Sequence, residues 1–324
     1  MKKFAFYIAL GLLLWTSCRE ETPYIHLSGN ALGTHFSIKY KGQSNYHTAV
    51  DSLFNRINAS LSTYHSNSLI SRINRNDSLV LTDTHFEKVY QKALRIYKET
   101  GGYFDPSVGI LVNAWGFGPK KPENKPDSSR IKQLMQSVGF DKIQLKYHKI
   151  TKENPGIYID FNAIAKGYTV DVIGRFLESK GIGDYMVEIG GEIRARGKNP
   201  DNTYWSIGIE KPVPDASRAL DTIIHIQNQS VATSGNYRKF KIDKKGHKYV
   251  HTINPKTGFT EQNDVLSASI ITSLDCADAD AYATACMVMG LQKSKVFIKS
   301  HPELHAILIY LDTEKKMRIF DSAK

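Results

Sequence analysis

Apolar residues recur every three or four positions in several parts of the chain. This spacing places them on one face of a helix, so it predicts amphipathic helices that pack against a core. The predicted helices include three that end near Ser62, Gly139 and Gly181, and two more over Asp280–Met289 and near Leu291–Lys299. Most of the boundaries fall at or beside glycine, which is common where helices end.

Other segments alternate apolar and polar residues, which is the pattern of a half-buried strand. The alternation is clear at 34–40, 205–209 and 224–226, and Tyr185–Ile189 has strand composition before a pair of glycines. Helices and strands do not alternate strictly, so the predicted class is α+β. No repeat or long linker interrupts the 324 residues. The predicted architecture is therefore a single compact domain of mixed sheets with packed helices.

The first residues have the character of a bacterial leader. Two lysines precede the apolar run Phe4–Trp15, which is short for a membrane span and suits the central part of a signal peptide. Residues 1–18 are predicted to be a lipoprotein signal peptide in which Cys18 carries the lipid anchor. A cleaved secretory signal and an uncleaved anchor are the alternatives. Residues 19–29 are predicted to be a tether, and 30–324 the folded domain.

Composition limits the function classes. Apolar residues make up 41% of the chain and charged residues 23%, as in a globular protein. The net charge of +11 is compatible with an anionic ligand or membrane surface. No arginine-rich run with interleaved aromatic residues occurs, so nucleic acid is not an expected partner. Cys276 and Cys286 lie ten residues apart in one helical segment, too far apart to pair, and are predicted to be free thiols.

The segment from Asp160 to Asp171 combines a carboxylate, small residues, a lysine and a glycine before a helix. Small residues let the backbone approach a phosphate, and a lysine balances its charge. The spacing of Asp160, Ala163 and Lys166 predicts that one helical turn brings them to one face. The alternative is that Asp160 only caps the helix and Lys166 is solvated.

A second segment carries oxygen ligands. Asp280 and Thr284 lie four residues apart in a predicted helix, so they share a face. A carboxylate and a hydroxyl at this spacing suit a hard cation such as Mg²⁺, whereas the simpler interpretation is a capping Asp and a core-facing Thr. His251 follows a strand and precedes a turn; it is either structural or, beside a metal and a phosphate, a proton acceptor.

Many short motifs occur together in the order of one family. The chain resembles the FAD:protein FMN transferase family (ApbE-type flavin transferases) over about residues 30 to 290. The motifs that carry the resemblance are Leu32-Gly33-Thr34, Leu61-Ser62-Thr63-Tyr64, Gly101-Gly102-Tyr103-Phe104-Asp105-Pro106, Val112 to Gly118, Asp160 to Asp171, Gly190-Gly191, Thr233-Ser234-Gly235, His251 to Gly258 and Ala277 to Thr284.

The resemblance implies an enzyme that splits FAD at its pyrophosphate and joins FMN, through its phosphate, to a Thr or Ser hydroxyl of a partner protein, releasing AMP. It implies Mg²⁺ as cofactor, FAD as substrate, and as acceptor a flavin-bearing subunit of a membrane redox complex. A lipid-anchored enzyme on the periplasmic face of the inner membrane would meet that acceptor. A hydrolase that cleaves FAD without an acceptor and a periplasmic flavin-binding lipoprotein without turnover are the alternatives.

The resemblance also assigns roles to residues. The carbonyl of Ala163, with Asp280 and Thr284, matches the metal ligands, and His251 is the candidate that accepts the proton of the acceptor hydroxyl. Leu32 stands where methionine is common in the family, and Asn254 replaces a frequent aspartate. The positions that match FAD contacts are Leu32, Tyr64, Tyr103, Phe104, Asp105, Asp160, Lys166 and Ile253.

Overall fold

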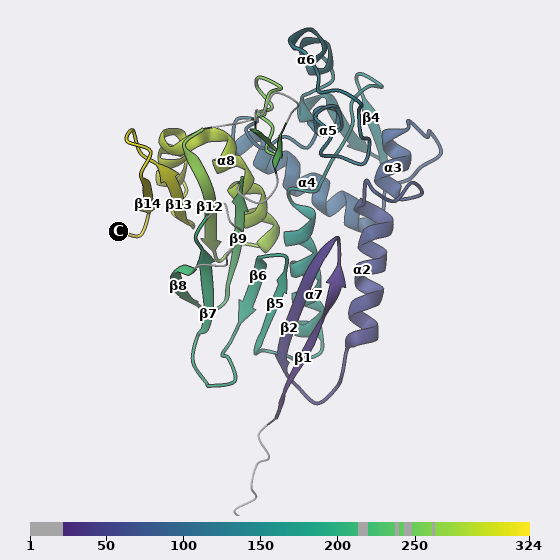
Figure 1. Cartoon of the computed structure of the whole chain (residues 1–324). Coiled ribbons are helices and arrows are strands. Elements are labelled where there is room, and N and C mark those ends of the chain that lie inside the picture. Colours follow the sequence, from purple (N-terminus) through teal and green to yellow (C-terminus); the bar gives the residue numbers. More distant parts are fainter. Residues whose placement is uncertain (1–21, 213–219, 237–239, 243–247, 261–262) are drawn as a thin grey trace, which may run out of the picture.

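An eight-stranded antiparallel sheet runs through the computed structural model of the chain (Figure 1). The structure describes residues 22–212, 220–236, 240–242, 248–260 and 263–324. In their order across the sheet, the strands are β1 (Tyr24–Ala31), β2 (Thr34–Lys41), β5 (Tyr185–Ile189), β6 (Glu192–Arg196), β9 (Gln229–Gly235), β12 (Val265–Thr272), β13 (Leu304–Leu311) and β14 (Met317–Asp321).

Alternation along β6 separates the two faces of this sheet. Ile193 and Ala195 pack in an apolar cluster with Trp205 from the hairpin of β7 (Trp205–Glu210) and β8 (Leu220–Ile226). Glu192 and Arg194 have the opposite phase, because side chains two residues apart in a strand lie on the same face. They meet the helices, and β6 therefore presents charged groups where its neighbours present apolar ones.

Two helices lie against each other on that second face. They are α7 (Ala165–Ser179) and α8 (Cys276–Lys299). A Cβ atom added at Gly167 would lie 2.4 Å from the backbone oxygen of Cys276, so only glycine allows the first turn of α7 to come this close to α8. Gly290 interrupts α8 with φ 73°, which explains why the sequence predicted two helices in this segment.

The other elements surround this frame. Figure 1 shows α5, α6 and β4 gathered at one end of the molecule, with α2 running beside α7. The bounds of these elements are α2 (His47–Leu61), α3 (Leu69–Asn74), α4 (Thr84–Glu99), α5 (Gly109–Ala114), α6 (Ser128–Met135), the 3₁₀ turn η2 (Phe140–Lys142), β3 (Ile143–Lys146), β4 (Lys149–Lys152), β10 (Phe240–Ile242) and β11 (Lys248–Val250).

The predicted α+β class and single compact domain are confirmed, and Cys276 and Cys286 are buried free thiols. The predicted tether at 19–29 is wrong from Tyr24 onward, because Tyr24–Ala31 forms the edge strand β1. Leu27 is the only fully buried residue of β1, so the strand shows no clear apolar alternation, and backbone pairing to β2 defines it instead. Cys18 lies outside the described residues. Within them, no helix is long and apolar enough to cross a membrane.

Candidate active site

Three charged side chains from three elements meet where α7 begins. The ammonium of Lys166, in the first turn of α7, pairs with Glu192 Oε1 at the start of β6. The same ammonium lies 4.0 Å from Asp280 Oδ1 on α8. Asp280 Oδ2 accepts a hydrogen bond from the Gly167 amide at 3.2 Å. The close packing of α7 on α8 therefore brings a lysine and two carboxylates into one small volume.

Burial dominates the electrostatics of this cluster. Glu192 is 2% exposed and Asp280 is 3% exposed. Desolvation raises the pKa of Glu192 above its usual range, while the charge of Lys166 opposes this rise and the charge of Asp280 adds to it. Desolvation raises the pKa of Asp280 as well. For Lys166, burial opposes the charged form, but attraction to Asp280 and Glu192 outweighs it and raises the lysine pKa. One cation thus serves two buried carboxylates.

Several oxygens around this cluster have no protein partner or only a weak one. Glu192 Oε2 is buried without a hydrogen bond. Within the described part of the chain, no hydrogen bond reaches the carbonyl of Ala163. The Thr284 hydroxyl contacts Ser234 Oγ at 3.2 Å, at the end of β9.

These oxygens fit a hard divalent cation, which takes carboxylate, hydroxyl and backbone oxygen ligands. No group of three or more His, Cys, Asp or Glu placed to hold a metal occurs among the described residues. A metal here would therefore depend on the hydroxyl of Thr284 and the carbonyl of Ala163 in addition to Asp280. The donor types predicted from the sequence are those that Mg²⁺ takes, and the ligand set stays a prediction.

The predicted sharing of one helical face by Asp160, Ala163 and Lys166 is wrong. Helix α7 begins at Ala165, so Asp160 and Ala163 lie in the segment that precedes it. Asp160 Oδ1 accepts from the Asn162 amide at 2.8 Å, and the backbone amide of Asp160 donates to the Pro106 carbonyl at 2.8 Å. Asp160 is therefore tied to the segment after Asp105, and burial raises its pKa.

Tyr64 lies within the electrostatic influence of Asp160. Its ring is 60% exposed, and its hydroxyl donates to the Phe117 carbonyl over 3.4 Å. Burial of the hydroxyl, with the charge of Asp160, raises the pKa of Tyr64. An exposed aromatic ring within the electrostatic influence of a buried carboxylate is a suitable surface for a planar heterocycle, because stacking uses the ring face and the carboxylate accepts hydrogen bonds.

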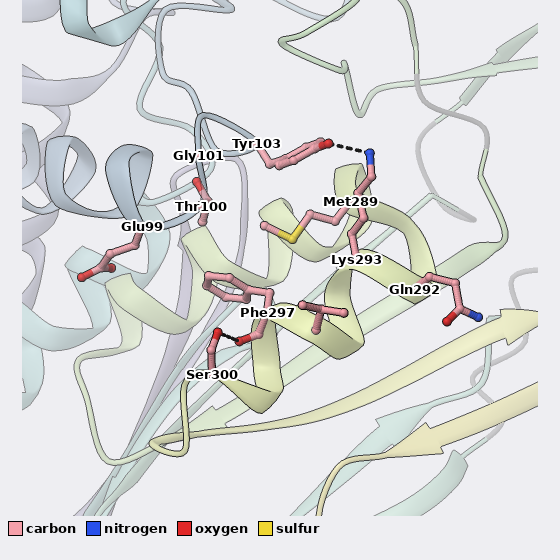
Figure 2. Close-up of a pocket in the computed structure, with 10 residues that line it drawn as sticks. Glu99, Thr100, Gly101, Tyr103, Met289, Gln292, Lys293, Phe297 and Ser300 are labelled. Atoms are coloured by element: carbon pink, nitrogen blue, oxygen red, sulfur yellow. Dashed lines mark hydrogen bonds between the residues drawn. The ribbon is translucent and has the colours of Figure 1, made fainter.

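The Tyr103-Phe104-Asp105 motif divides between core and surface. Phe104 is buried in the main core. Asp105 Oδ1 accepts from the Ser107 amide at 2.8 Å and from its hydroxyl at 2.6 Å, and burial raises the pKa of Asp105 to about 6. In Figure 2 the Tyr103 hydroxyl accepts from Lys293, at 2.6 Å, across a groove of about 510 Å³.

This groove lies between the loop after α4 and the second half of α8, and Met289 and Phe297 contribute to its lining. Among the described residues, no contact joins Tyr103 to Lys166, Glu192 or Asp280. The structure therefore places the predicted FAD contact at Tyr103 apart from the charged cluster.

His251 and Ile253 lie on a segment attached to the end of β9. The Thr252 hydroxyl donates to Asn236 Oδ1 at 2.6 Å, and Ser234, two residues earlier, contacts Thr284. The His251 ring meets the Phe117 ring edge to face at 6.3 Å. Ile253 is buried in a separate apolar cluster with Trp115. The segment that carries His251 therefore contacts Asn236, close to the Ser234–Thr284 contact, and the His251 ring contacts Phe117, whose carbonyl accepts from Tyr64.

Leu32 occupies the tip of the β1–β2 hairpin with φ 53°, followed by Gly33 with φ 73°. A leucine in this left-handed region is unusual and costs free energy, and such strain gathers at functional sites. The tip lies beside the β5–β6 turn, where a Cβ atom added at Gly190 would come within 2.7 Å of the Thr34 methyl group. Leu32 is thus at the end of the sheet where Glu192 begins β6.

Glu192 is the residue that the sequence analysis missed. The signal was present, because Glu192 directly follows Gly190-Gly191 and alternates with Ile193 and Ala195, so its side chain has the phase of the helix-covered face. A carboxylate predicted to point under a helix needs a cation or a proton. Only the packing of α7 against β6 identifies that cation as Lys166.

Comparisons with known proteins identify the family of this chain. A model described as the ApbE family matches residues 32–308. The FAD:protein FMN transferase of Haemophilus influenzae is 36% identical over 302 residues, covering 89% of this chain and 86% of that protein. The FAD:protein FMN transferase of Vibrio cholerae is 38% identical over 291 residues, covering 87% and 86%.

Solved structures give the same result. The flavin transferase ApbE from Vibrio cholerae superposes with a TM-score of 0.84 at 34% identity, covering 93% of this chain and 97% of its own. The ApbE protein of Thermotoga maritima gives a TM-score of 0.82 at 28% identity, also covering 93% and 97%. The family match over residues 32–308 spans both central helices and the segments that carry the candidate site. The chain therefore belongs to the ApbE family.

Proposed function

We infer that this chain carries the activity of its family: it cleaves FAD and transfers the FMN half to a hydroxyl of a partner protein. The observation that carries this proposal is the buried cluster of Lys166, Glu192 and Asp280, in which Glu192 Oε2 has no hydrogen-bond partner and Asp280 Oδ1 lies 4.0 Å from the ammonium. Curated relatives at 36% and 38% identity, both FAD:protein FMN transferases, support it.

The reaction balances without a redox partner. The acceptor oxygen bonds to the phosphorus of the FMN half, the bond from that phosphorus to the bridging oxygen breaks, and AMP leaves with the bridging oxygen. The hydroxyl proton passes to a base, for which we propose His251. The ammonium of Lys166 donates hydrogen bonds to the pyrophosphate oxygens, and a fixed donor of this kind typically contributes on the order of 3 kcal/mol to transition-state stabilisation.

We propose Mg²⁺ as the cofactor, held by Asp280, Thr284 and the carbonyl of Ala163. When bound, Mg²⁺ supplies positive charge that offsets the pyrophosphate and the leaving AMP. Tyr64 and Asp160 offer an aromatic face and a hydrogen-bond acceptor for one heterocycle of FAD. Leu32 supplies an apolar contact at the hairpin tip.

We propose that the acceptor is a Thr or Ser of a flavin-bearing subunit of a membrane redox complex, and that the enzyme works at the periplasmic face of the inner membrane, anchored by lipid on Cys18. The lysine pair and apolar run that precede Cys18 support the anchor. Labelling cells with a fatty-acid analogue and comparing the parent with Cys18→Ala tests it; equal label in both would contradict the anchor.

Incubation with FAD, Mg²⁺ and a candidate acceptor tests the activity. Transfer gives a fluorescent acceptor band that survives denaturation, with AMP released in equal amount. Release of free FMN without a labelled protein indicates hydrolysis, and retention of intact FAD indicates binding only. Full turnover in the presence of EDTA would contradict the metal assignment.

The role of His251 has its own test. His251→Ala is expected to slow transfer by about 10²- to 10⁴-fold, the usual contribution of a general base, while FAD still binds. The rate of FMN transfer and the affinity for FAD are measured side by side. Transfer at the parent rate would remove His251 from the mechanism.

A further inference from the structure

Lys166 lies much closer to one of its two buried carboxylate neighbours than to the other. Its ammonium is in direct contact with Glu192 Oε1, whereas Asp280 Oδ1 is 4.0 Å away, at the outer limit of an ion pair. Asp280 Oδ1 therefore lies beside a cation without being bound by it, and Oδ2 receives only the 3.2 Å hydrogen bond from Gly167. Lys166 thus pairs directly with Glu192, and the Asp280 carboxylate has no direct ion pair with the lysine.

We propose that Glu192 is a positioning residue that holds Lys166 away from Asp280 and so keeps the Asp280 carboxylate open for a divalent cation. This inference rests on the proposed metal role of Asp280. It assigns to Glu192 a function outside the ligand set predicted from the sequence.

The placement of Glu192 supports this function. Its side chain leaves β6 in the same phase as that of Arg194, which pairs with Asp171 on the same helix at 3.0 Å. Glu192 and Arg194 of β6 thus form ion pairs with Lys166 and Asp171 of α7, and the pair with Glu192 fixes the position of the Lys166 ammonium. Strand β6 sits rigidly between β5 and β9, so the carboxylate of Glu192 is held where it is.

The burial of Glu192 supports it too. A buried carboxylate is costly unless it is paired, and Lys166 is the cation paired with Glu192 within the described residues. No hydrogen bond anchors its second oxygen. Burying Glu192 costs free energy, and its described interaction is the pair with Lys166. This is the arrangement expected of a residue that positions the lysine.

Removing the charge of Glu192 leaves Lys166 one remaining buried carboxylate to pair with. A lysine side chain has a flexible stem of four carbons. An ammonium released from Glu192 can therefore close the 4.0 Å gap to Asp280. A direct Lys166–Asp280 pair would place positive charge where the metal must bind. Glu192→Gln should therefore weaken cation binding through Lys166, although Glu192 itself is not a ligand.

Calorimetric titration of the purified protein with Mg²⁺, without FAD, measures this directly. Glu192→Gln is expected to weaken Mg²⁺ binding by about 10- to 100-fold, the usual effect of altering a residue that orients metal ligands. Glu188→Gln is the matched control, because Glu188 lies on the neighbouring strand and accepts from the Gly191 amide at 2.8 Å. It should bind Mg²⁺ like the parent.

A double-mutant cycle separates positioning from direct participation. In a Lys166→Met background no ammonium remains to compete, so Glu192→Gln should change Mg²⁺ affinity less than about threefold, a small free-energy difference. A loss that persists in this background would overturn the proposal, since Glu192 would then act on the cation itself. Equal Mg²⁺ affinity of the parent and Glu192→Gln would also overturn it.

Mg²⁺ binding by the parent protein separates a failure of the proposed metal site from a failure of the proposed role of Glu192. If the parent fails to bind Mg²⁺, the metal site at Asp280 and this role of Glu192 both fail. If the parent binds Mg²⁺ and Glu192→Gln binds it equally well, only the role of Glu192 fails. Thermal melts of every variant without metal confirm that each one is folded before its affinity is compared.

Discussion

Asp278 and Asp280 lie two residues apart on α8, and both are almost fully buried. Asp278 is surrounded by cations: Lys92 Nζ lies 2.7 Å from its Oδ2, and Arg95 pairs with its Oδ1. Asp280 has one backbone hydrogen bond and a lysine at 4.0 Å. The same residue type on the same helix is thus fully paired in one position and left incomplete in the other.

The difference separates structure from function. Asp278 joins α8 to α4, where Lys92 also reaches Asp275 at 2.9 Å. Its charge is balanced within the fold, so no ligand is needed. Asp280 faces the first turn of α7, where Glu192 Oε2 is unpartnered and where the charge of Asp280 is balanced only by a lysine shared with Glu192. Burial alone does not mark an active site; incomplete pairing of a buried charge does.

Asp280→Ala should give the largest effect. Loss of the carboxylate removes the proposed metal ligand, so the rate of FMN transfer should fall by at least about a hundredfold. Stability should change little, because the residue lacks a close cationic partner. Transfer rate and urea unfolding of the same preparation measure both quantities. An active Asp280→Ala enzyme would end the assignment of the site.

Asp278→Ala should do the opposite. It removes the buried carboxylate that Lys92 and Arg95 share, although Lys92 keeps Asp275 and Arg95 keeps Glu99. We therefore expect a loss of about 2 kcal/mol in unfolding free energy, which is typical of lost hydrogen bonds to charged groups. Below the unfolding transition, the transfer rate per folded molecule should match the parent. A variant as stable as the parent, but inactive, would reverse the comparison.

Asp105 shows a third way to bury a carboxylate, through hydrogen bonds from Ser107 and without a cation in the described part of the chain. Burial raises its pKa from the usual range near 4 to about 6. Between these values the folded state holds a proton that the unfolded state has released, so the unfolding free energy falls as pH rises. This group should contribute a decrease of about 2 kcal/mol from pH 4 to pH 6.

Asp105→Asn keeps both acceptor contacts and removes the titration. The fall in unfolding free energy between pH 4 and pH 6 should therefore be smaller in the variant by that amount. Urea unfolding at pH 4, 5 and 6 measures the difference. Parallel pH profiles for the two proteins would show that Asp105 does not titrate in this range.

Much of the frame follows from the sequence. Helix α2 ends at Leu61, where the apolar spacing ends, and α7 ends at Ser179, close to the predicted stop at Gly181. Strand β5 has the predicted bounds, Tyr185–Ile189. Strand β1 was not predicted because only Leu27 of this edge strand is fully buried, so the strand carries no clear apolar alternation. Local patterns report burial, and an element held mainly by backbone pairing leaves no pattern.

For the candidate site, the sequence identified segments better than contacts. It joined Asp280 and Lys166 in one site, which the 4.0 Å separation supports. It placed Asp160 on a helical face that does not exist, because the helix begins five residues later at Ala165. Its match of Tyr103 to an FAD contact stays a prediction, and the structure adds that the Tyr103 hydroxyl accepts from Lys293. Such contacts depend on how elements pack.

By itself, the sequence of this protein determined which residue types were available and where the elements with a buried face lie, because periodicity and glycine act over a few residues. The tertiary structure decided which charges face each other. The bare backbone of Gly167 lets α7 approach α8. That approach brings Lys166 near Asp280, and the phase of β6 gives the lysine to Glu192. Side chains from positions 166, 192 and 280 meet only in the folded protein, because long-range packing has no local signature.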